Sequence, residues 1–304
     1  MDLLAWLFGK KQQSAVTSTA DSRLRTTVHY EMIEGRRHVA DAPYLLPKDD
    51  EEIDRLDFQH YILRAILKGN HLVPVQQAAS ILDVGCGTGR WMIEMAQASP
   101  QADVVGFDLT LPVSNAIRSQ FPLNCRFLEG NVLDGLPFAA KKFDFVHQRL
   151  LVFALPAHQW LSEARELLRV TRVGGWIELV EIDIAFENMG PASARLAEWS
   201  TEVSKRRGID TAMSHRAGEI LETAGLVHVK AERLSNPIGD WGGRVGKVAA
   251  IGVQAVNKAM RQQVIAQLNV SPDEYDRALA QSLAEYDQYH SYSYAYIAYG
   301  QCRE

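Results

Sequence analysis

The sequence predicts an α/β fold in which helices pack on a mostly parallel sheet. The first observation is a short apolar run, Ile81 to Val84, which stops at glycines spaced two apart and is followed by helical periodicity from Trp91. The second is that further apolar runs alternate with amphipathic segments along the chain, as in βαβ units. The third is the alternation of apolar and polar residues in 292–300, which predicts a final strand.

The glycines Gly85, Gly87 and Gly89 predict a tight loop that lets a ligand lie against bare backbone. The helix that follows would direct unpaired N–H groups and its positive dipole end at that ligand. A dinucleotide fingerprint needs its last glycine three positions after the second, whereas Gly87 and Gly89 are two apart. Asp83, just ahead of the loop, would repel a pyrophosphate but suits a ligand that carries an ammonium group. The alternative is a glycine-rich turn without a ligand.

The loop sequence LDVGCGTG, residues 82–89, resembles motif I of the class I S-adenosylmethionine (SAM) dependent methyltransferases. The resemblance implies a Rossmann-like sheet of seven strands with the last strand antiparallel. It also implies SAM as cofactor, with S-adenosylhomocysteine as product. Within the loop it implies cofactor contacts from Asp83, Gly85, Cys86, Gly87 and Gly89.

Further cofactor contacts are expected at the ends of the next two strands. Asp108 ends the strand 102–108 at about 20 residues from the loop, the distance at which a carboxylate takes the ribose hydroxyls in related folds. Its neighbour Leu109 is expected to share the site. In the strand 125–132, Asn131 stands where the family usually has an acidic residue facing the adenine amino group, and its amide oxygen can still accept that hydrogen bond. Val132 follows it in the predicted site.

The fourth strand, 143–149, runs to the edge of the sheet at which open α/β folds hold their ligands. His147 and Gln148 therefore reach the site region, Gln148 as a cofactor contact. Arg149 is expected to pair either with the cofactor carboxylate or with Glu181. His147 is the first candidate for a general base, although a histidine at a strand end also serves as a structural hydrogen-bond partner.

A predicted helix at 157–170, with Glu163 on its exposed face, ends at Gly174-Gly175, and a fifth strand follows at 176–184. Alternation places Glu181 and Asp183 on one face near the end of that strand. One of these acids lines the acceptor pocket, or both are solvated. Glu181 is the second candidate for a base, and His215, at the head of a later helix, is the third.

The segment before the core starts with an apolar stretch, residues 1–9, which predicts a helical tail, an interfacial helix or a dimer-contact arm. A hairpin is predicted over 26–39. In 44–57, YLLPKDDEEIDRLD, acidic residues crowd a helix start, which suits the helix dipole. The apolar face of that helix is expected to include Ile53, Leu56, Ile62 and Leu63.

Together with the phrase GGWIE at 174–178, the segment 44–57 resembles the LaeA-like methyltransferases, which have many fungal members linked to secondary metabolism. The resemblance implies that Tyr44 closes over the methionine end of the cofactor. We expect residues 1–70 to form an arm, hairpin and helix that cover the site. Residues 71–304 form the SAM-binding domain, with helical cap insertions at 186–213 and 236–290.

The amino-acid composition limits the classes of partner that the protein is expected to bind. The 304 residues carry a net charge of −5 with dispersed basic residues, which lacks the basic patch of a nucleic-acid binder. The three cysteines show no metal-ligand spacing and no disulfide framework, so we expect a cytoplasmic, metal-free protein. The apolar stretch at the start is too short to span a bilayer. The sequence leaves both a monomer and a homodimer as alternatives.

Three functions fit these observations. The first is methyl transfer to a small-molecule acceptor, such as a specialised metabolite, on oxygen, nitrogen or carbon by in-line displacement. The second is a LaeA-like methyltransferase that acts on protein or on a regulatory partner. The third is a SAM-binding interaction module without catalysis.

Overall fold

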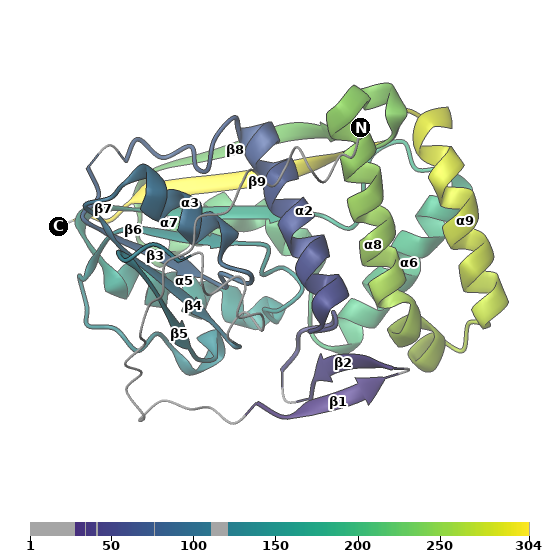
Figure 1. The fold of residues 1–304 in the computed structure, drawn as a ribbon, viewed down its shortest axis with the longest axis horizontal. Helices are drawn as coiled ribbons and strands as arrows, with labels where there is room; N and C mark the ends of the chain where they lie inside the picture. Colours follow the sequence, from purple (N-terminus) through teal and green to yellow (C-terminus); the bar gives the residue numbers. More distant parts are fainter. Residues whose placement is uncertain (1–27, 34, 41, 76, 111–120, 304) are drawn as a thin grey trace.

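A seven-stranded sheet forms the centre of the protein (Figure 1). The computed structural model describes residues 28–33, 35–40, 42–75, 77–110 and 121–303, so the predicted arm at residues 1–9 lies outside the described residues. The strands are β3 (Ser80–Val84), β4 (Asp103–Asp108), β5 (Cys125–Glu129), β6 (Phe143–Arg149), β7 (Thr171–Ile182), β8 (Val227–Pro237) and β9 (Tyr292–Gln301).

The order of the strands across the sheet is β5-β4-β3-β6-β7-β9-β8. The first five are parallel, and β9 runs antiparallel to both β7 and β8. The predicted α/β fold with seven strands and an antiparallel last strand is therefore confirmed. Because β3 lies in the middle of the parallel strands, the glycine loop that follows it opens at the centre of the ligand-binding edge.

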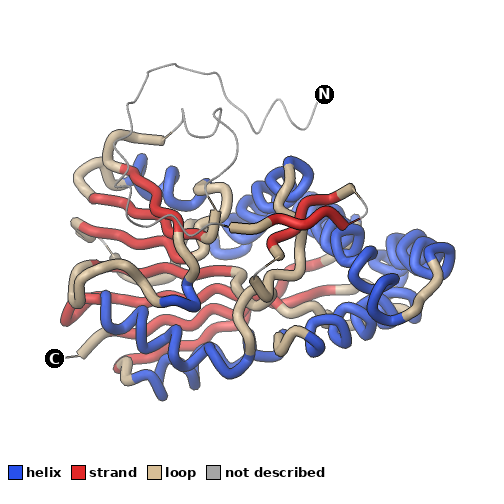
Figure 2. The backbone as a smooth tube through the Cα atoms, turned by 90° about the horizontal axis from the view of Figure 1, so that it is seen from below, coloured by secondary structure: helices blue, strands red, loops and turns tan. Residues whose placement is uncertain are grey.

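Helices cover the sheet and extend beyond it. Figure 2 shows a helical group gathered past one end of the strands. The helices packed along the sheet are α3 (Arg90–Ala98), α5 (Trp160–Val170) and α7 (Ala217–Ala224), and the short 3₁₀ turns are η1 (Val132–Asp134), η2 (Ala157–Gln159), η3 (Thr211–Arg216) and η4 (Asp240–Gly242). The helical cap consists of α6 (Pro191–Arg206), α8 (Gly243–Leu268) and α9 (Pro272–Gln288), which pack on one another. Both predicted insertions are thus helical.

The segment before the core links the cap to the sheet. Strands β1 (Tyr30–Ile33) and β2 (Arg36–Val39) form the predicted antiparallel hairpin. Helix α2 (Asp50–Leu67) begins at Asp49, whose carboxylate accepts a hydrogen bond from the backbone N–H of Glu52 and two from Arg36 of β2. Since α2 contacts both α3 and α8, it lies between the glycine loop and the cap.

The apolar face predicted for α2 describes only part of its packing. Ile53, Leu56 and Ile62 are half-buried, whereas the fully buried positions include Glu52, Arg55 and Asp57. Burial of charged groups costs free energy unless they are paired, so the buried side of α2 must hold partners for them. These partners lie in the candidate active site.

The fifth strand begins five residues earlier than the sequence predicted. Strand β7 starts at Thr171, so Gly174 and Gly175 lie inside the strand and not between helix and strand. The pairing of β6 with β7 shifts register there. A Cβ on Gly175 would lie 2.9 Å from the backbone oxygen of Asp144, and Gly174 has a φ of +73°. The glycines therefore permit an irregular, closely packed strand, and their turn-like appearance in the sequence was misleading.

Glu163 on α5 was predicted to be exposed, and that prediction was wrong. Its side chain is 5% exposed, and among the described residues its Oε1 has no hydrogen-bond partner. Burial raises the pKa of Glu163 to about 8. Helical spacing places Glu163 on the same face of α5 as Trp160 and Leu167, which are also buried, so the prediction was wrong in assigning it to the opposite face because of its charge.

We expect Glu163→Gln to stabilise the protein at pH 8 and to change little at pH 5. Between the unfolded pKa near 4.5 and the folded pKa of about 8, the folded state binds the extra proton, so stability falls as pH rises. The free energy of unfolding falls by at most about 1.4 kcal/mol per pH unit, and the uncharged amide of the Gln side chain removes this loss. Urea unfolding at both pH values measures this. The exposed Glu222→Gln on α7 is the control, and equal effects of both substitutions would contradict the prediction.

Candidate active site

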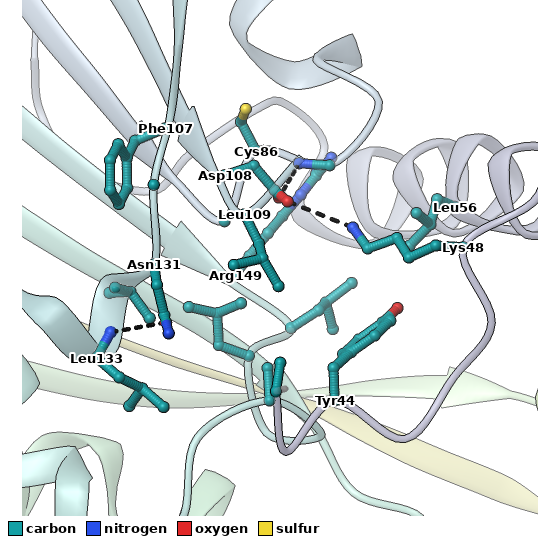
Figure 3. A pocket seen from close by; sticks show the side chains of 18 of the residues that line it. Tyr44, Lys48, Leu56, Cys86, Phe107, Asp108, Leu109, Asn131, Leu133 and Arg149 are labelled. Carbon is teal, nitrogen blue, oxygen red and sulfur yellow. Dashed lines mark hydrogen bonds and ion pairs between the residues drawn. The ribbon is translucent and has the colours of Figure 1, made fainter. Parts of the chain in front are cut away.

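A cavity of about 930 Å³, here called the cofactor cavity, opens where β3, β4, β5 and β6 end (Figure 3). Most of the predicted cofactor-binding residues line it: Tyr44, Gly85, Cys86, Gly87, Asp108, Leu109, Asn131 and Val132. The sequence did not assign several other lining residues to the cofactor, among them Lys48, Leu56, Gln59, Thr88, Leu133 and Leu151. Asp83, Gly89 and Gln148 do not line this cavity.

The glycine loop has the left-handed backbone that only glycine adopts without strain. Gly85 has a φ of +69° and Gly87 a φ of +56°. A Cβ on Gly85 would lie 2.5 Å from Cδ2 of Leu151, whereas a Cβ on Gly87 would meet nothing closer than Leu56 at 3.7 Å. A side chain at position 85 would therefore clash with Leu151, whereas the absence of a side chain at Gly87 leaves its backbone exposed to the cofactor cavity. Gly89 begins helix α3 with a φ of +78°.

Asp108 is the central carboxylate of the cofactor cavity. It is 9% exposed, and its Oδ2 accepts a hydrogen bond from the backbone N–H of Gly87 at 2.8 Å. Its Oδ1 lies 3.3 Å from Nζ of Lys48, which reaches it from the segment before α2 (Figure 3). Burial alone would lower the pKa of Lys48, but the charge of Asp108, the hydrogen bond to it and the charge of Glu52 together raise that pKa. Oδ1 also accepts a long hydrogen bond of 3.4 Å from the backbone N–H of Thr110, whereas Oδ2 keeps a lone pair for a ligand hydroxyl.

Arg149 is a buried cation on the wall of the cofactor cavity. Its Nη2 lies 2.9 Å from Nδ1 of His60, and burial lowers its pKa. Among the described residues no carboxylate lies within ion-pair distance of its guanidinium. The predicted alternative, pairing with Glu181, is not formed, because the Glu181 oxygens accept the backbone N–H groups of Leu151 and Val152. Arg149 thus keeps donors for an anionic ligand group.

Asn131 begins the turn η1 at the opposite wall. Its Oδ1 accepts a hydrogen bond from the backbone N–H of Leu133 at 3.0 Å (Figure 3). One lone pair of the Asn131 side-chain oxygen is therefore used to cap the turn η1. The second lone pair of the amide oxygen is left for an amino group of a ligand.

A buried charge network joins α2 to the cofactor cavity. The Tyr44 hydroxyl donates to Oε1 of Glu52 at 2.9 Å, and Glu52 accepts two hydrogen bonds of 2.7 Å from Arg55. Burial raises the pKa of Tyr44 well above its usual value, so the phenol stays protonated. The opposite charges of Glu52 and Arg55 at i and i+3 were the sequence signal for this pair.

Asp57, one turn further along α2, ties the helix to the glycine loop. Its carboxylate accepts hydrogen bonds of 2.7 Å from Thr88 Oγ1 and from Arg90 Nε. The acidic run in the sequence was interpreted as a helix cap, and only Asp49 has that role. Asp57 instead holds the loop in position.

Comparison with known proteins identifies the family. Residues 81–175 match a family model described as a methyltransferase domain. Methyltransferase pytC from Aspergillus terreus is 30% identical over 245 residues, which cover 75% of this chain and 70% of pytC. The chain belongs to the methyltransferase family.

Two further relatives support this assignment. Methyltransferase str2 from Strobilurus tenacellus is 37% identical over 155 residues, 49% of this chain and 54% of str2, so the match spans only about half the length of that relative. The secondary metabolism regulator LAE1 from Cochliobolus heterostrophus is 28% identical over 211 residues, 65% of this chain and 67% of LAE1. The predicted resemblance to LaeA-like methyltransferases is thereby confirmed.

The methyltransferase family uses SAM, as the sequence predicted. The side chains present fit this cofactor. A carboxylate with free lone pairs, Asp108, and a guanidinium without a carboxylate partner among the described residues, Arg149, lie on the wall of one cavity. These charges suit the ribose hydroxyls and the methionine carboxylate of SAM.

Asp83 and His147 form a buried pair behind the methyltransferase site. Asp83 Oδ1 lies 2.9 Å from His147 Nδ1, and each residue is 1% exposed. The His147 ring stacks on Trp91 with 3.8 Å between centroids. Burial lowers the pKa of His147 to about 4, against the effect of Asp83. Neither Asp83 nor His147 lines the cofactor cavity, although the sequence had placed both in the site region.

The other two candidates for a base also lie outside the lining of the cofactor cavity. Glu181 is fully buried, and burial raises its pKa to about 8. Its hydrogen bonds to the backbone of Leu151 and Val152 position the loop that lines the cavity. His215 Nε2 lies 2.7 Å from Asp183 Oδ2. Gln148 is buried in β6.

A second cavity of about 880 Å³ lies beneath the helical cap. It is bounded by α2, α6 and α8 and by the ends of β7, β8 and β9. Asp183 lines it and Glu181 does not, which separates the two acids that the sequence could not distinguish.

Among the described residues no helix is long and apolar enough to cross a membrane.

Proposed function

We propose that this methyltransferase transfers the methyl group of SAM to a small-molecule acceptor of specialised metabolism. The observation that carries this proposal is the second cavity beneath the helical cap, which shares Gln59 with the cofactor cavity. A small molecule beneath the cap would lie beside the methyl donor and away from bulk water. The similarity to pytC and str2, which are named methyltransferases, supports the activity.

The sulfonium of bound SAM supplies an activated methyl group. The protein holds cofactor and acceptor in line and excludes water. Asp108 would accept hydrogen bonds from the ribose hydroxyls, and Arg149 would neutralise the methionine carboxylate. Tyr44 and Cys86 line the cofactor cavity, but burial raises the pKa of each well above its usual value, so neither is a base near neutral pH. This favours an acceptor nitrogen, carbon or already acidic hydroxyl, which needs no strong base.

A regulatory methyltransferase that acts on protein is the second candidate. The similarity to the regulator LAE1, which covers 67% of that protein, favours it. A homodimer, a cytoplasmic location, the absence of nucleic-acid partners and the division of the chain at residue 70 stay predictions.

Incubating the pure protein with methyl-labelled SAM, a fungal metabolite extract and a protein lysate tests the proposal. We expect label in the organic-soluble metabolites and none in protein. Gly87→Val should bind SAM at least tenfold more weakly, because the side chain strains a left-handed residue and enters the cavity. Gly174→Val, at a φ of +73° with nothing within 4 Å of the added Cβ, carries similar strain away from the cavity and should bind SAM normally. Label in protein alone would favour the regulatory candidate, and SAM binding without any transfer would favour a non-catalytic module.

A further inference from the structure

The second cavity is too large to be a packing defect. Protein interiors contain few voids larger than a water molecule, whereas pockets for small molecules enclose about 300–1,000 Å³. The second cavity has a volume of about 880 Å³, part of which is open to solvent, so a small molecule can enter it. Small residues on the facing cap helices keep it open, and these are Ala197 on α6 and Ala249 and Gly252 on α8.

Most of the lining is aliphatic or aromatic. It includes Ile62, Leu63, Ile66, Phe153, Ile182, Ile184, Phe186, Ile238, Val253 and Val256. Its two charged residues are already paired. Arg55 is held by Glu52, and Asp183 lies 2.7 Å from His215. A charged ligand would therefore enter without a counterion, at a large desolvation cost.

One polar atom of the lining lacks a partner. Asn236 donates through Nδ2 to Ser293 Oγ at 3.2 Å, but its Oδ1 is buried without a hydrogen bond in the described structure. A buried acceptor without a donor costs about 1–3 kcal/mol. Because Oδ1 has almost no accessible surface, a ligand with a hydroxyl or N–H group would bond to it once the Asn236 side chain turns toward the cavity.

The second cavity adjoins the cofactor cavity at α2. Gln59 lines both cavities, and its Oε1 accepts a hydrogen bond of 3.0 Å from Arg55 Nη1. Arg55 in turn pairs with Glu52, which accepts from Tyr44 of the cofactor cavity. A ligand in the second cavity would therefore reach the methyl donor at the Gln59 end.

We propose that the second cavity binds the methyl acceptor, and that this acceptor is an uncharged, largely apolar molecule with a hydroxyl or N–H donor that bonds to Asn236 Oδ1. This inference rests on the proposed function. It limits the methyl acceptor to lipophilic aromatic or aliphatic compounds, and it excludes phosphorylated, carboxylated and quaternary ammonium substrates.

A pair of fluorescent probes tests the class of ligand. N-phenyl-1-naphthylamine is neutral, apolar and carries one N–H, whereas 8-anilinonaphthalene-1-sulfonate adds a sulfonate to the same skeleton. With the protein saturated in S-adenosylhomocysteine, we expect the neutral probe to bind at one site, at least tenfold more tightly than the sulfonate. Equal affinity for the two probes would overturn the assignment of an uncharged ligand.

Variants of α8 and β8 locate the probe. Val253→Trp fills the cavity and should weaken binding of the neutral probe at least tenfold, whereas Ile251→Trp, at a position 45% exposed on the same helix, should leave it unchanged. Asn236→Leu should weaken binding about fivefold, the equivalent of one hydrogen bond. Unchanged binding to Val253→Trp would overturn the site.

Calorimetric titration with SAM separates this inference from the proposed function. Val253→Trp should bind SAM like the wild type and yet fail to label organic-soluble metabolites. Normal labelling by this variant would overturn the acceptor role of the second cavity while leaving methyl transfer intact. Failure of the wild type to bind SAM would instead overturn the proposed function, and the acceptor role with it.

Discussion

Asp108→Ala is expected to weaken SAM binding by about 100-fold while the protein stays folded. The carboxylate lies at the end of β4 on the wall of the cofactor cavity, where it would accept hydrogen bonds from both ribose hydroxyls. Two hydrogen bonds to a charged group contribute about 1.5 kcal/mol each, and about 3 kcal/mol corresponds to about 100-fold in the dissociation constant. The substitution also leaves Lys48 without its partner. Isothermal titration with SAM measures the effect.

Asp103→Ala is the matched control, because Asp103 is the carboxylate at the other end of the same strand. It pairs with Arg126 on the surface at 2.9 Å and is far from the lining of the cavity. Surface pairs contribute about 0–1 kcal/mol, so the SAM affinity should stay within about twofold of the wild type. Wild-type affinity in a folded Asp108→Ala protein would contradict the assignment of Asp108 to the ribose.

Local sequence was sufficient to predict the features that depend on local backbone. Gly85 and Gly87 have positive φ angles that restrict the residue type, and Asp108 ends an apolar strand at a known distance from them. Both signals lie within one βαβ unit, so no tertiary knowledge was needed. The seven-stranded sheet with an antiparallel last strand was implied by the resemblance to class I methyltransferases, and the order of the strands across the sheet was not predicted.

Contacts between distant segments were not predictable in this way. Thr88 bonds to Asp57 across 31 residues, and Arg149 contacts His60 across 89 residues. Asp57 and His60 both lie on α2. In a sequence, charged residues on a helix are usually interpreted as facing solvent. Because the glycine loop, α3 and β6 supply the partners of Asp57 and His60, these side chains are buried and paired. Glu163 was misplaced for a different reason, because its charge was taken as a sign of exposure although helical spacing puts it on the buried face of α5.

His147 was the leading candidate for a base because it lies near the end of β6, and its role is open to a direct test. His147→Ala is expected to lower the free energy of unfolding by about 3–5 kcal/mol, since it leaves Asp83 buried without a partner and removes the ring stacked on Trp91. Because the pKa of His147 is held at about 4, the wild type also gains stability as pH rises from 4 to 6.5, and the variant loses that gain. Chemical unfolding across this pH range measures both effects.

Two further variants separate a structural from a catalytic His147. His158→Ala, on the exposed turn η2, should change stability by less than about 0.5 kcal/mol. Asp83→Asn combined with His147→Ala should cost less than the sum of the single changes, because the amide removes the buried charge that His147 compensates. A catalytic base would give another pattern, in which His147→Ala abolishes methyl transfer at unchanged stability. The buried position of the pair behind the glycine loop predicts the reverse, with SAM binding and transfer retained wherever the variant is folded.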